Sequence, residues 1–465
     1  MACRLAMLFV TFASVGALAG CATYSDSFDS IQHNLSARQH DAALQEIEKQ
    51  SGSKTDHVLY LLNKGMVLRM KGDFVGSNQA LESAKEEMDS LYAASVSENA
   101  LSFLVNDATV SYAGDDYEQV LVHLYMALNY LELGNKADAR VEALQVDIKL
   151  REIGEHIPES KFTEDAFSRY LTGLIYEESG EWSDAMIAYR KAYEAYKKYQ
   201  VNFGLSIPDM LKHDLIRLAQ RQGLKNEAAQ YMKEFGIEKL QDSKPEQEGE
   251  LVYILNNGLA PIKREHVVSM WAPPSAVVTG KSKQKSSNAT TMPVLVNIAL
   301  PYYESRPNNV IEARISVFGK QVDTQLMEDI DAIARASLDA RMPAITARSI
   351  ARAIAKGAIQ KSVDNAGNGG NNDVAAQLIS SLVVRVAAAA TERADTRSWL
   401  TLPSNIQMAR LQLPPGKYDI KVELLGTDGQ AMATREYPGV EITRARKTYL
   451  SQHWIPDYQI TRRKR

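Results

Sequence analysis

Apolar residues recur at helical spacing between residues 27 and 236, a stretch that contains almost no proline. Because side chains three and four residues apart share one face of a helix, this pattern predicts a series of amphipathic helices. From residue 250 onward the pattern changes to short apolar runs that end in turn residues, such as Asn256-Asn257-Gly258. Runs of this kind predict strands. The sequence therefore predicts a helical first half and a β second half, joined by the polar linker 241–250.

Within the helical half, small and aromatic residues repeat on one grid. In the clearest copy, Gly173 is followed by Tyr176, by the turn residue Gly180, and then by Ala185 and Tyr189. Further copies have their turn glycines at Gly72, Gly134 and, more weakly, Gly223, and a degenerate helix near residues 42–47 is expected to cap the array. Small residues let two antiparallel helices cross closely, and glycine accepts the left-handed backbone that a tight turn needs.

This grid resembles the tetratricopeptide repeat (TPR), a pair of antiparallel helices. The resemblance implies a TPR-like α-solenoid that offers a concave surface to a peptide or a protein partner. The copies are spaced more widely than the roughly 34 residues of a regular TPR array, so long connections are expected between them. The alternative interpretation is an irregular helical bundle.

Tyrosine is abundant in the helical half, and tyrosine supplies rigid, amphipathic contact area. Tyr189, Tyr193 and Tyr196 fall at positions i, i+4 and i+7, which places them on one face of a helix. These three, together with Tyr176 and Trp182, are the candidate partner-binding residues. The alternative for each of them is packing between helices.

The second half has the pattern of a β-sandwich with a helical insertion. Strands are expected at 250–255, 293–300, 311–318, 407–413, 418–425, 435–442 and 447–450. Short strands separated by turn signals are typical of an antiparallel sandwich. The insertion covers about 324–391, with helices expected at 326–337, 345–363 and 374–391 around a Gly/Asn-rich loop. Its helical hairpin, residues 345–391, has three interpretations: packing on the sandwich, self-association, or contact with a membrane surface.

The N-terminus is expected to carry an export signal, either that of a lipoprotein or an ordinary secretory signal with an incidental cysteine. An apolar run at residues 5–18 follows Arg4 and is too short to span a bilayer. Leu18-Ala19-Gly20-Cys21 closes this run and resembles the lipobox of bacterial lipoproteins. That resemblance implies cleavage before Cys21, attachment of lipid (palmitate) at Cys21 and, since Ala22 is not aspartate, a periplasm-facing position on the outer membrane. The second cysteine, Cys3, leaves with the signal, so no thiol remains for a disulfide, a metal site or a nucleophile.

One polar cluster stands out as possible chemistry: Glu392, Arg393, Asp395 and Arg397, where the insertion returns to the sandwich. Carboxylates beside arginines can form an acid–base or sugar-binding site, or they can be structural ion pairs. An open cleft would favour the first interpretation and a buried, mutually paired cluster the second. The sequence contains no phosphate-binding loop, zinc-protease motif or serine-hydrolase elbow, and its net charge of −4 does not favour nucleic acid. We therefore expect no enzyme activity, no cofactor and no metal.

Taken together, the chain resembles the uncharacterised TPR-containing outer-membrane lipoproteins of Gram-negative bacteria. Its expected parts are a signal peptide at 1–20, a TPR-like helical repeat domain at 21–240, and a β-sandwich-like domain at 241–465. The resemblance implies a lipid-anchored adaptor that binds a periplasmic or outer-membrane protein in cell-envelope assembly, with self-association as a further possibility. Two alternatives remain: a protein that binds or processes peptidoglycan or another polysaccharide, and an oligomeric component of an export apparatus.

Overall fold

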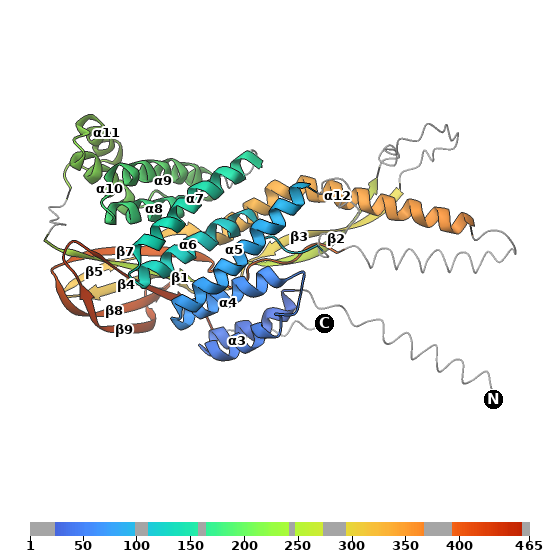
Figure 1. The fold of residues 1–465 in the computed structure, drawn as a ribbon, viewed down its shortest axis with the longest axis horizontal. Coiled ribbons are helices and arrows are strands. Elements are labelled where there is room, and N and C mark those ends of the chain that lie inside the picture. The colour runs from blue at the N-terminus through green and yellow to red at the C-terminus, as the bar shows by residue number, and fades with distance from the viewer. Residues whose placement is uncertain are drawn as a thin grey trace.

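A computed structural model of the chain describes residues 24–97, 110–156, 164–240, 247–272, 294–366 and 393–457. A short 3₁₀ turn, η2 (Asp26–Phe28), leads into the helices of the first half. These are α2 (Asp29–Ser36), α3 (His40–Glu48), α4 (His57–Lys71), α5 (Phe74–Ser97), α6 (Asp116–Glu132), α7 (Lys136–His156), α8 (Ala166–Glu178), α9 (Trp182–Phe203), α10 (Asp209–Arg221) and α11 (Lys225–Phe235). Consecutive helices pack in pairs and the pairs stack along the molecule (Figure 1). The prediction of a TPR-like array is confirmed by this arrangement.

The grid of small residues explains how the helices pair. The four predicted turn glycines, Gly72, Gly134, Gly180 and Gly223, all have the left-handed backbone, with φ between +70° and +89°. Inside α8, Gly173 lies directly against the ring of Tyr189 on α9, because a Cβ on Gly173 would meet ring carbons at 2.4 Å. A larger residue at this position would therefore push the two helices apart.

The described part of the second half contains two four-stranded sheets and one long hairpin. The first sheet has the order β10-β1-β7-β6, in which β1 (Gly249–Asn257) runs parallel to β10 (Lys447–Trp454) and antiparallel to β7 (Asn405–Leu413). Its edge strand β6 spans Gln325–Asp329, and the second sheet has the order β5-β4-β8-β9. The second sheet is formed by β5 (Lys320–Asp323), β4 (Val310–Val317), β8 (Gly416–Gly426) and β9 (Ala431–Ile442). The parallel pair β1–β10 departs from the purely antiparallel sandwich that the turn signals predict.

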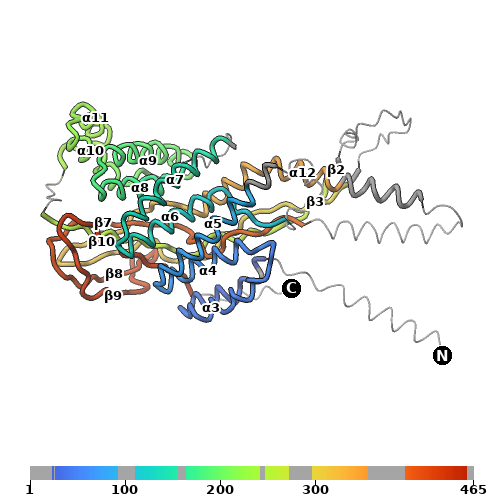
Figure 2. The backbone as a smooth tube through the Cα atoms, viewed as in Figure 1, coloured from blue at the N-terminus to red at the C-terminus, as the bar shows by residue number. Residues whose placement is uncertain are grey.

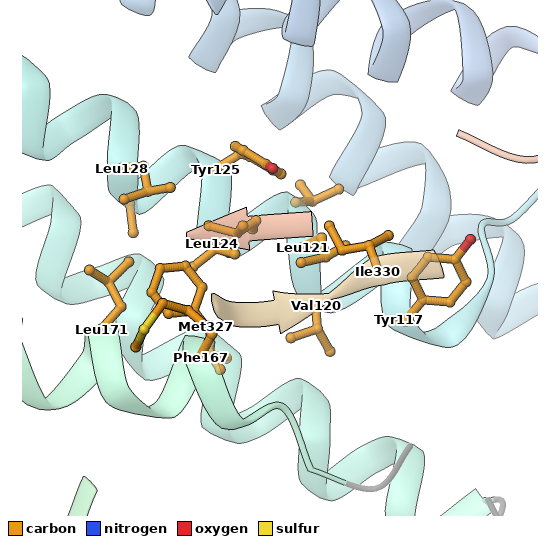
Figure 3. Packing of buried hydrophobic residues seen from close by; sticks show 14 of the residues in the cluster. Tyr117, Val120, Leu121, Leu124, Tyr125, Leu128, Phe167, Leu171, Met327 and Ile330 are labelled. Atoms are coloured by element: carbon orange, nitrogen blue, oxygen red, sulfur yellow. The ribbon is translucent and has the colours of Figure 1, made fainter. Parts of the chain in front are cut away.

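The first sheet is packed on both of its faces. Along β1, Leu251, Tyr253 and Leu255 join the apolar core between the two sheets. Val252 and Ile254, which point the other way, belong to the same core as the helices. Figure 3 shows Met327 of β6 and Ile330 beside the buried side chains of α6 and α8. Helix α11 ends at Phe235 and strand β1 begins at Gly249, and the two halves on either side share one continuous core.

The insertion differs from its prediction in two respects. Residues 326–329 lie in strand β6, and a single helix, α12 (Ile330–Ala366), follows and contains Pro343. The third predicted helix, 374–391, lies outside the described residues. The hairpin of β2 (Ile262–Ala272) and β3 (Val294–Glu304) runs beside the beginning of α12, where Arg335 bonds the carbonyl of Tyr303 at 2.6 Å (Figure 2). Strand β2 was not predicted, because its polar residues Lys263, Arg264 and Glu265 interrupt the apolar pattern.

Candidate functional site

The inner face of the helical array, which the TPR resemblance assigns to a partner, is covered by this chain's own first sheet. Tyr125 of α6 donates a hydrogen bond to Asn256 of β1 at 2.9 Å. The backbone N–H of Trp399, in the segment that leads to β7, donates to Glu118 of α6 at 2.7 Å. The predicted concave binding groove is therefore already occupied, and this part of the prediction is wrong for the fold described here.

The candidate tyrosines lie inside this covered region or between helices. Tyr189 and Tyr196 are fully buried. The Tyr189 hydroxyl donates to Glu177 at 2.7 Å, and the Tyr196 hydroxyl donates to the carbonyl of Met327 at 2.9 Å. The Tyr189 ring packs between α8 and α9, Tyr196 joins α9 to β6, and both hydroxyls find partners within the chain. They do not present a surface to another molecule.

The other candidates have similar surroundings. Tyr193 is buried and its hydroxyl donates to Glu234 of α11. Tyr176 is also buried, with the guanidinium of Arg140 at 5.6 Å from its ring centre. Trp182 is half-buried and stacks under the guanidinium of Arg221 at 4.0 Å. Trp182 lines a cavity with a volume of about 280 Å³ between α8–α10 and the ends of β1, β7 and β10.

The described residues of the predicted polar cluster form ion pairs that hold neighbouring segments of the chain together. Arg397 is buried, pairs with Asp395 at 2.8 Å and with Asp56 at 3.2 Å, and donates to the carbonyl of Val110. Arg393 pairs with Glu265 of β2 at 3.1 Å. Glu392 lies outside the described residues. These contacts fasten the returning segment to the start of α4 and to β2. Arg397 is buried and paired with Asp395, and Arg393 pairs with Glu265, so these charges are engaged in structural ion pairs, which counts against a sugar-binding or acid–base site.

A buried network of charges joins the array to the sheet. Arg410 of β7 bonds Glu250 of β1 in a bidentate pair at 2.8 and 3.1 Å. The same guanidinium contacts Asp214 of α10 and the hydroxyl of Tyr170 of α8. Burial alone would raise the pKa of Asp214, but Arg410 and Arg217 outweigh it and lower that pKa. Asp214 is therefore ionised in the folded protein, and each charge in the network depends on the others.

At the same interface, burial disfavours the ionised form of three other carboxyl groups, so their ionisation lowers the stability of the folded protein. Glu328 of β6 accepts from the N–H of Phe167 and from the hydroxyl of Tyr199, both at 3.2 Å. Its burial and the nearby charge of Asp165 raise its pKa well above the usual value. Burial raises the pKa of Asp165 itself to about 6. Burial and Asp115 likewise raise the pKa of Glu118 to about 7. These groups make the stability of the interface dependent on pH.

The outer helices of the array expose a small apolar patch. The ion pairs Arg140–Glu181 at 2.5 Å and Asp147–Lys191 at 3.1 Å link α7 with α9. Leu144 and Ile187 lie on the linked helix faces between these two pairs and are 44% and 48% exposed. Val141 is half exposed beside them. We refer to Val141, Leu144 and Ile187 as the outer patch.

Neither membrane-spanning helices nor metal sites are found among the described residues. No helix in this part of the chain is long and apolar enough to cross a membrane. No group of three or more His, Cys, Asp or Glu side chains within the same ranges is placed to hold a metal ion.

Comparison with known proteins gives only distant likenesses. The chain matches no family model and no curated protein. A crystal structure of MamA is 17% identical over 44% of this chain and 91% of that chain, with a TM-score of 0.28. The apo form of RapI is 14% identical over 51% of this chain and 59% of that chain, with a TM-score of 0.34. Likenesses this distant say nothing about function, and the description of the array as helix pairs rests on this structure alone.

One signal in the sequence could have revealed the covered groove. Residues 120–128 of helix α6 are apolar apart from His123, and the structure buries the helix on every side from Tyr117 through Asn129. A helix that is apolar around its whole circumference is surrounded by other elements, whereas a helix that lines an open groove keeps one polar face. The network around Arg410 had no such signal, because its members come from positions 170, 214, 250 and 410.

Proposed function

We propose that this protein is a lipid-anchored scaffold that binds a protein partner in the cell envelope through the outer side of its helical array. The observation that carries the proposal is the exposed outer patch on α7 and α9, in an array whose inner face is closed by its own sheet. Stacked helix pairs expose extended surfaces suited to protein partners. With the inner side closed, the outer side is the surface that remains for recognition.

The outer patch has the composition of a small recognition site. Its aliphatic side chains supply apolar area, and the flanking ion pairs Arg140–Glu181 and Asp147–Lys191 supply a polar rim. An apolar centre with a polar rim is the usual anatomy of a transient protein interface. The partner that suits it is an envelope protein with a matching aliphatic surface and charged side chains around it.

The anchor in this proposal is the lipid on Cys21, implied by the lipobox at residues 18–21. The absence of aspartate after that cysteine supports the outer membrane, with the array facing the periplasm. In this arrangement the lipid holds the protein at the membrane while the array recruits the partner. A single acyl chain binds a bilayer reversibly, whereas several chains anchor it stably.

Site-specific photocrosslinking in intact cells tests the proposed surface. A photoreactive residue is introduced at Leu144 or at Ile187, and a control at Phe318, which is 68% exposed just after β4 of the second sheet. We expect the same discrete crosslinked species from both patch positions and none of that species from Phe318. Identical products at all three positions, or none at the patch, would contradict the proposal.

A second variant separates loss of binding from loss of folding. Leu144→Ser with Ile187→Ser removes the apolar centre, and both side chains are already about half exposed, so the fold is expected to survive. The crosslinked species, probed from position Val141, is expected to disappear while the unfolding midpoint stays unchanged. If the species persists, the patch is not the contact.

A further inference from the structure

A second cavity lies on the opposite flank of the array and is strongly basic. It has a volume of about 470 Å³ and sits between α3–α5 and the strands β9 and β10. Six of its lining residues are basic: Arg38, His40, Arg69, Lys71, Arg435 and His453. Among the described residues that line it, none is Asp or Glu. The acids nearby include Asp41, which pairs with Lys71 at 2.6 Å, and Asp73, which helps to raise the pKa of Lys71. They also include Glu132, whose pKa is raised by burial and partly lowered by Arg69. Positive charge therefore remains in excess around the cavity.

Three hydrogen-bonding nitrogens of this cavity have no partner in the part of the chain that the structure describes. They are Nε of Arg69, Nε2 of His453 and Nε1 of Trp454, and all three atoms are buried. Arg69 itself is only 3% exposed, and its other two nitrogens bond Asn129 and Ser451. Native proteins rarely leave buried donors unsatisfied. Arg69 and Trp454 each keep a donor without an acceptor in the wall of this cavity, and this favours a ligand with acceptor atoms there.

The surrounding electrostatics favour an anion. Burial and the charge of Arg69 hold the pKa of His453 well below its usual value. Burial lowers the pKa of His40 as well, and the neighbouring Arg38, Lys71 and Arg435 add to this effect. Burial is the larger cause for both histidines, and the further lowering by Arg69, Arg38, Lys71 and Arg435 reflects the positive charge gathered around the cavity. An anion placed there would offset it.

We propose that this cavity binds the phosphate group of an organic phosphate. Arginine forks and ring N–H groups that converge from several sides match the several acceptor oxygens of a phosphate better than the two of a carboxylate. The volume exceeds what a bare ion needs and falls in the range of small-molecule sites. Apolar side chains of Leu35, Phe74 and Ile455 line the same cavity and suit the organic part of the ligand. This inference depends neither on the lipid anchor nor on the protein partner.

Fluorine NMR of the full chain, purified in neutral detergent with 5-fluorotryptophan, tests the proposal. The protein has four tryptophans, and Trp454→Phe identifies the resonance of the one that lines the cavity. Three probes are titrated at constant ionic strength set with chloride: inorganic phosphate, glycerol 3-phosphate, and a short-chain phosphatidic acid in the same micelles. We expect a saturable shift of the Trp454 resonance, with glycerol 3-phosphate binding more tightly than inorganic phosphate.

Charge-matched variants show whether the shift comes from this cavity. Arg38→Gln with Arg435→Gln removes two exposed lining cations, so the fold is retained. Arg151→Gln with Lys225→Gln removes the same charge from exposed positions on α7 and α11. The first pair is expected to weaken binding by about tenfold or more, the equivalent of one charged hydrogen bond, and the second pair by less than about twofold.

The outcomes divide clearly. A shift with glycerol 3-phosphate supports a soluble organic phosphate, and a shift with phosphatidic acid alone supports a lipid headgroup carrying the same group. No saturable shift of the Trp454 resonance with any probe overturns the proposal. Equal weakening by both charge-matched pairs also overturns it, because binding would then reflect overall charge.

Discussion

Replacing Arg410 with methionine tests whether the helical array and the sandwich form one folding unit. Methionine keeps much of the length and apolar volume of the arginine stem but removes the guanidinium. That group is the only cation that the structure shows bonded to both Asp214 of α10 and Glu250 of β1. The substitution therefore removes contacts between the helical array and the first sheet and leaves the contacts within each of them otherwise unchanged.

The expected cost follows from burial. The Arg410 side chain is 10% exposed, and those of Asp214 and Glu250 are 5% and 13% exposed. Removing one partner of a buried ion pair leaves an uncompensated charge, at a cost of about 3–5 kcal/mol. Whole domains are stable by about 5–15 kcal/mol, so the substitution is expected to remove a large share of the stability. Arg217 and Lys447 remain near these acids and limit the loss.

Arg314→Met is the matched control. Arg314 of β4 bonds Asp323 of β5 in a bidentate pair at 2.8 and 2.9 Å, but the two side chains are 37% and 40% exposed. The geometry resembles that of Arg410 with Glu250, whereas water reaches the groups. Exposed ion pairs contribute little, so the unfolding midpoint of Arg314→Met is expected to stay near that of the unaltered protein.

Urea unfolding, followed by far-ultraviolet circular dichroism and by tryptophan fluorescence, provides the measurement. Circular dichroism reports mainly on the helices, and fluorescence includes Trp399, which is buried at the interface. We expect Arg410→Met to lower the midpoint strongly with both probes moving together. Midpoints that fall equally for Arg410→Met and Arg314→Met would refute the reasoning. Two separate transitions in the unaltered protein would refute the single unit.

Three further predictions follow from the same structure. Gly173→Ala is expected to destabilise by about 1–3 kcal/mol, because its Cβ would lie 2.4 Å from the Tyr189 ring; Gly154→Ala in α7, with nothing within 4 Å, is expected to be neutral or stabilising in the same melts. Raising the pH from about 5 to about 8 is expected to lower the free energy of unfolding, because the raised pKa values of Glu328 and Asp165 mean that both ionise at a cost to the folded state. Glu328→Gln is expected to reduce this pH dependence of the free energy of unfolding. A pH dependence unchanged in this variant would contradict the prediction. Cys21→Ser is expected to abolish palmitate labelling and release the protein from membrane fractions; labelling that persists would exclude Cys21 as the lipid site.

A closed inner groove changes which residues are worth testing. Substitutions at Tyr189 or Tyr196 are expected to lower stability before they affect any partner, because both rings are buried against this chain. Loss of function after such a change would therefore not identify a binding site. The outer patch and the basic cavity offer exposed positions at which binding and folding can be separated.

Local structure was determined largely by the sequence. Helical spacing located the helix pairs, and the glycines at 72, 134, 180 and 223 marked turns whose left-handed backbone other residues adopt only with strain. Seven expected strands appear as β1, β3, β4, β7, β8, β9 and β10. These features are readable because they depend on residues close together in the chain.

Only the tertiary structure decided which surface is free. The sheet order places β1 with one face toward the second sheet and the other toward the helices, and that placement covers the inner face of the array. It also assembles Arg410 with Asp214 and Glu250, and Arg69 with His453 and Trp454. These groups lie far apart in sequence, and each residue by itself resembles an ordinary surface charge or a core residue. Their role arises from burial and proximity, which depend on how distant elements pack and not on any local pattern.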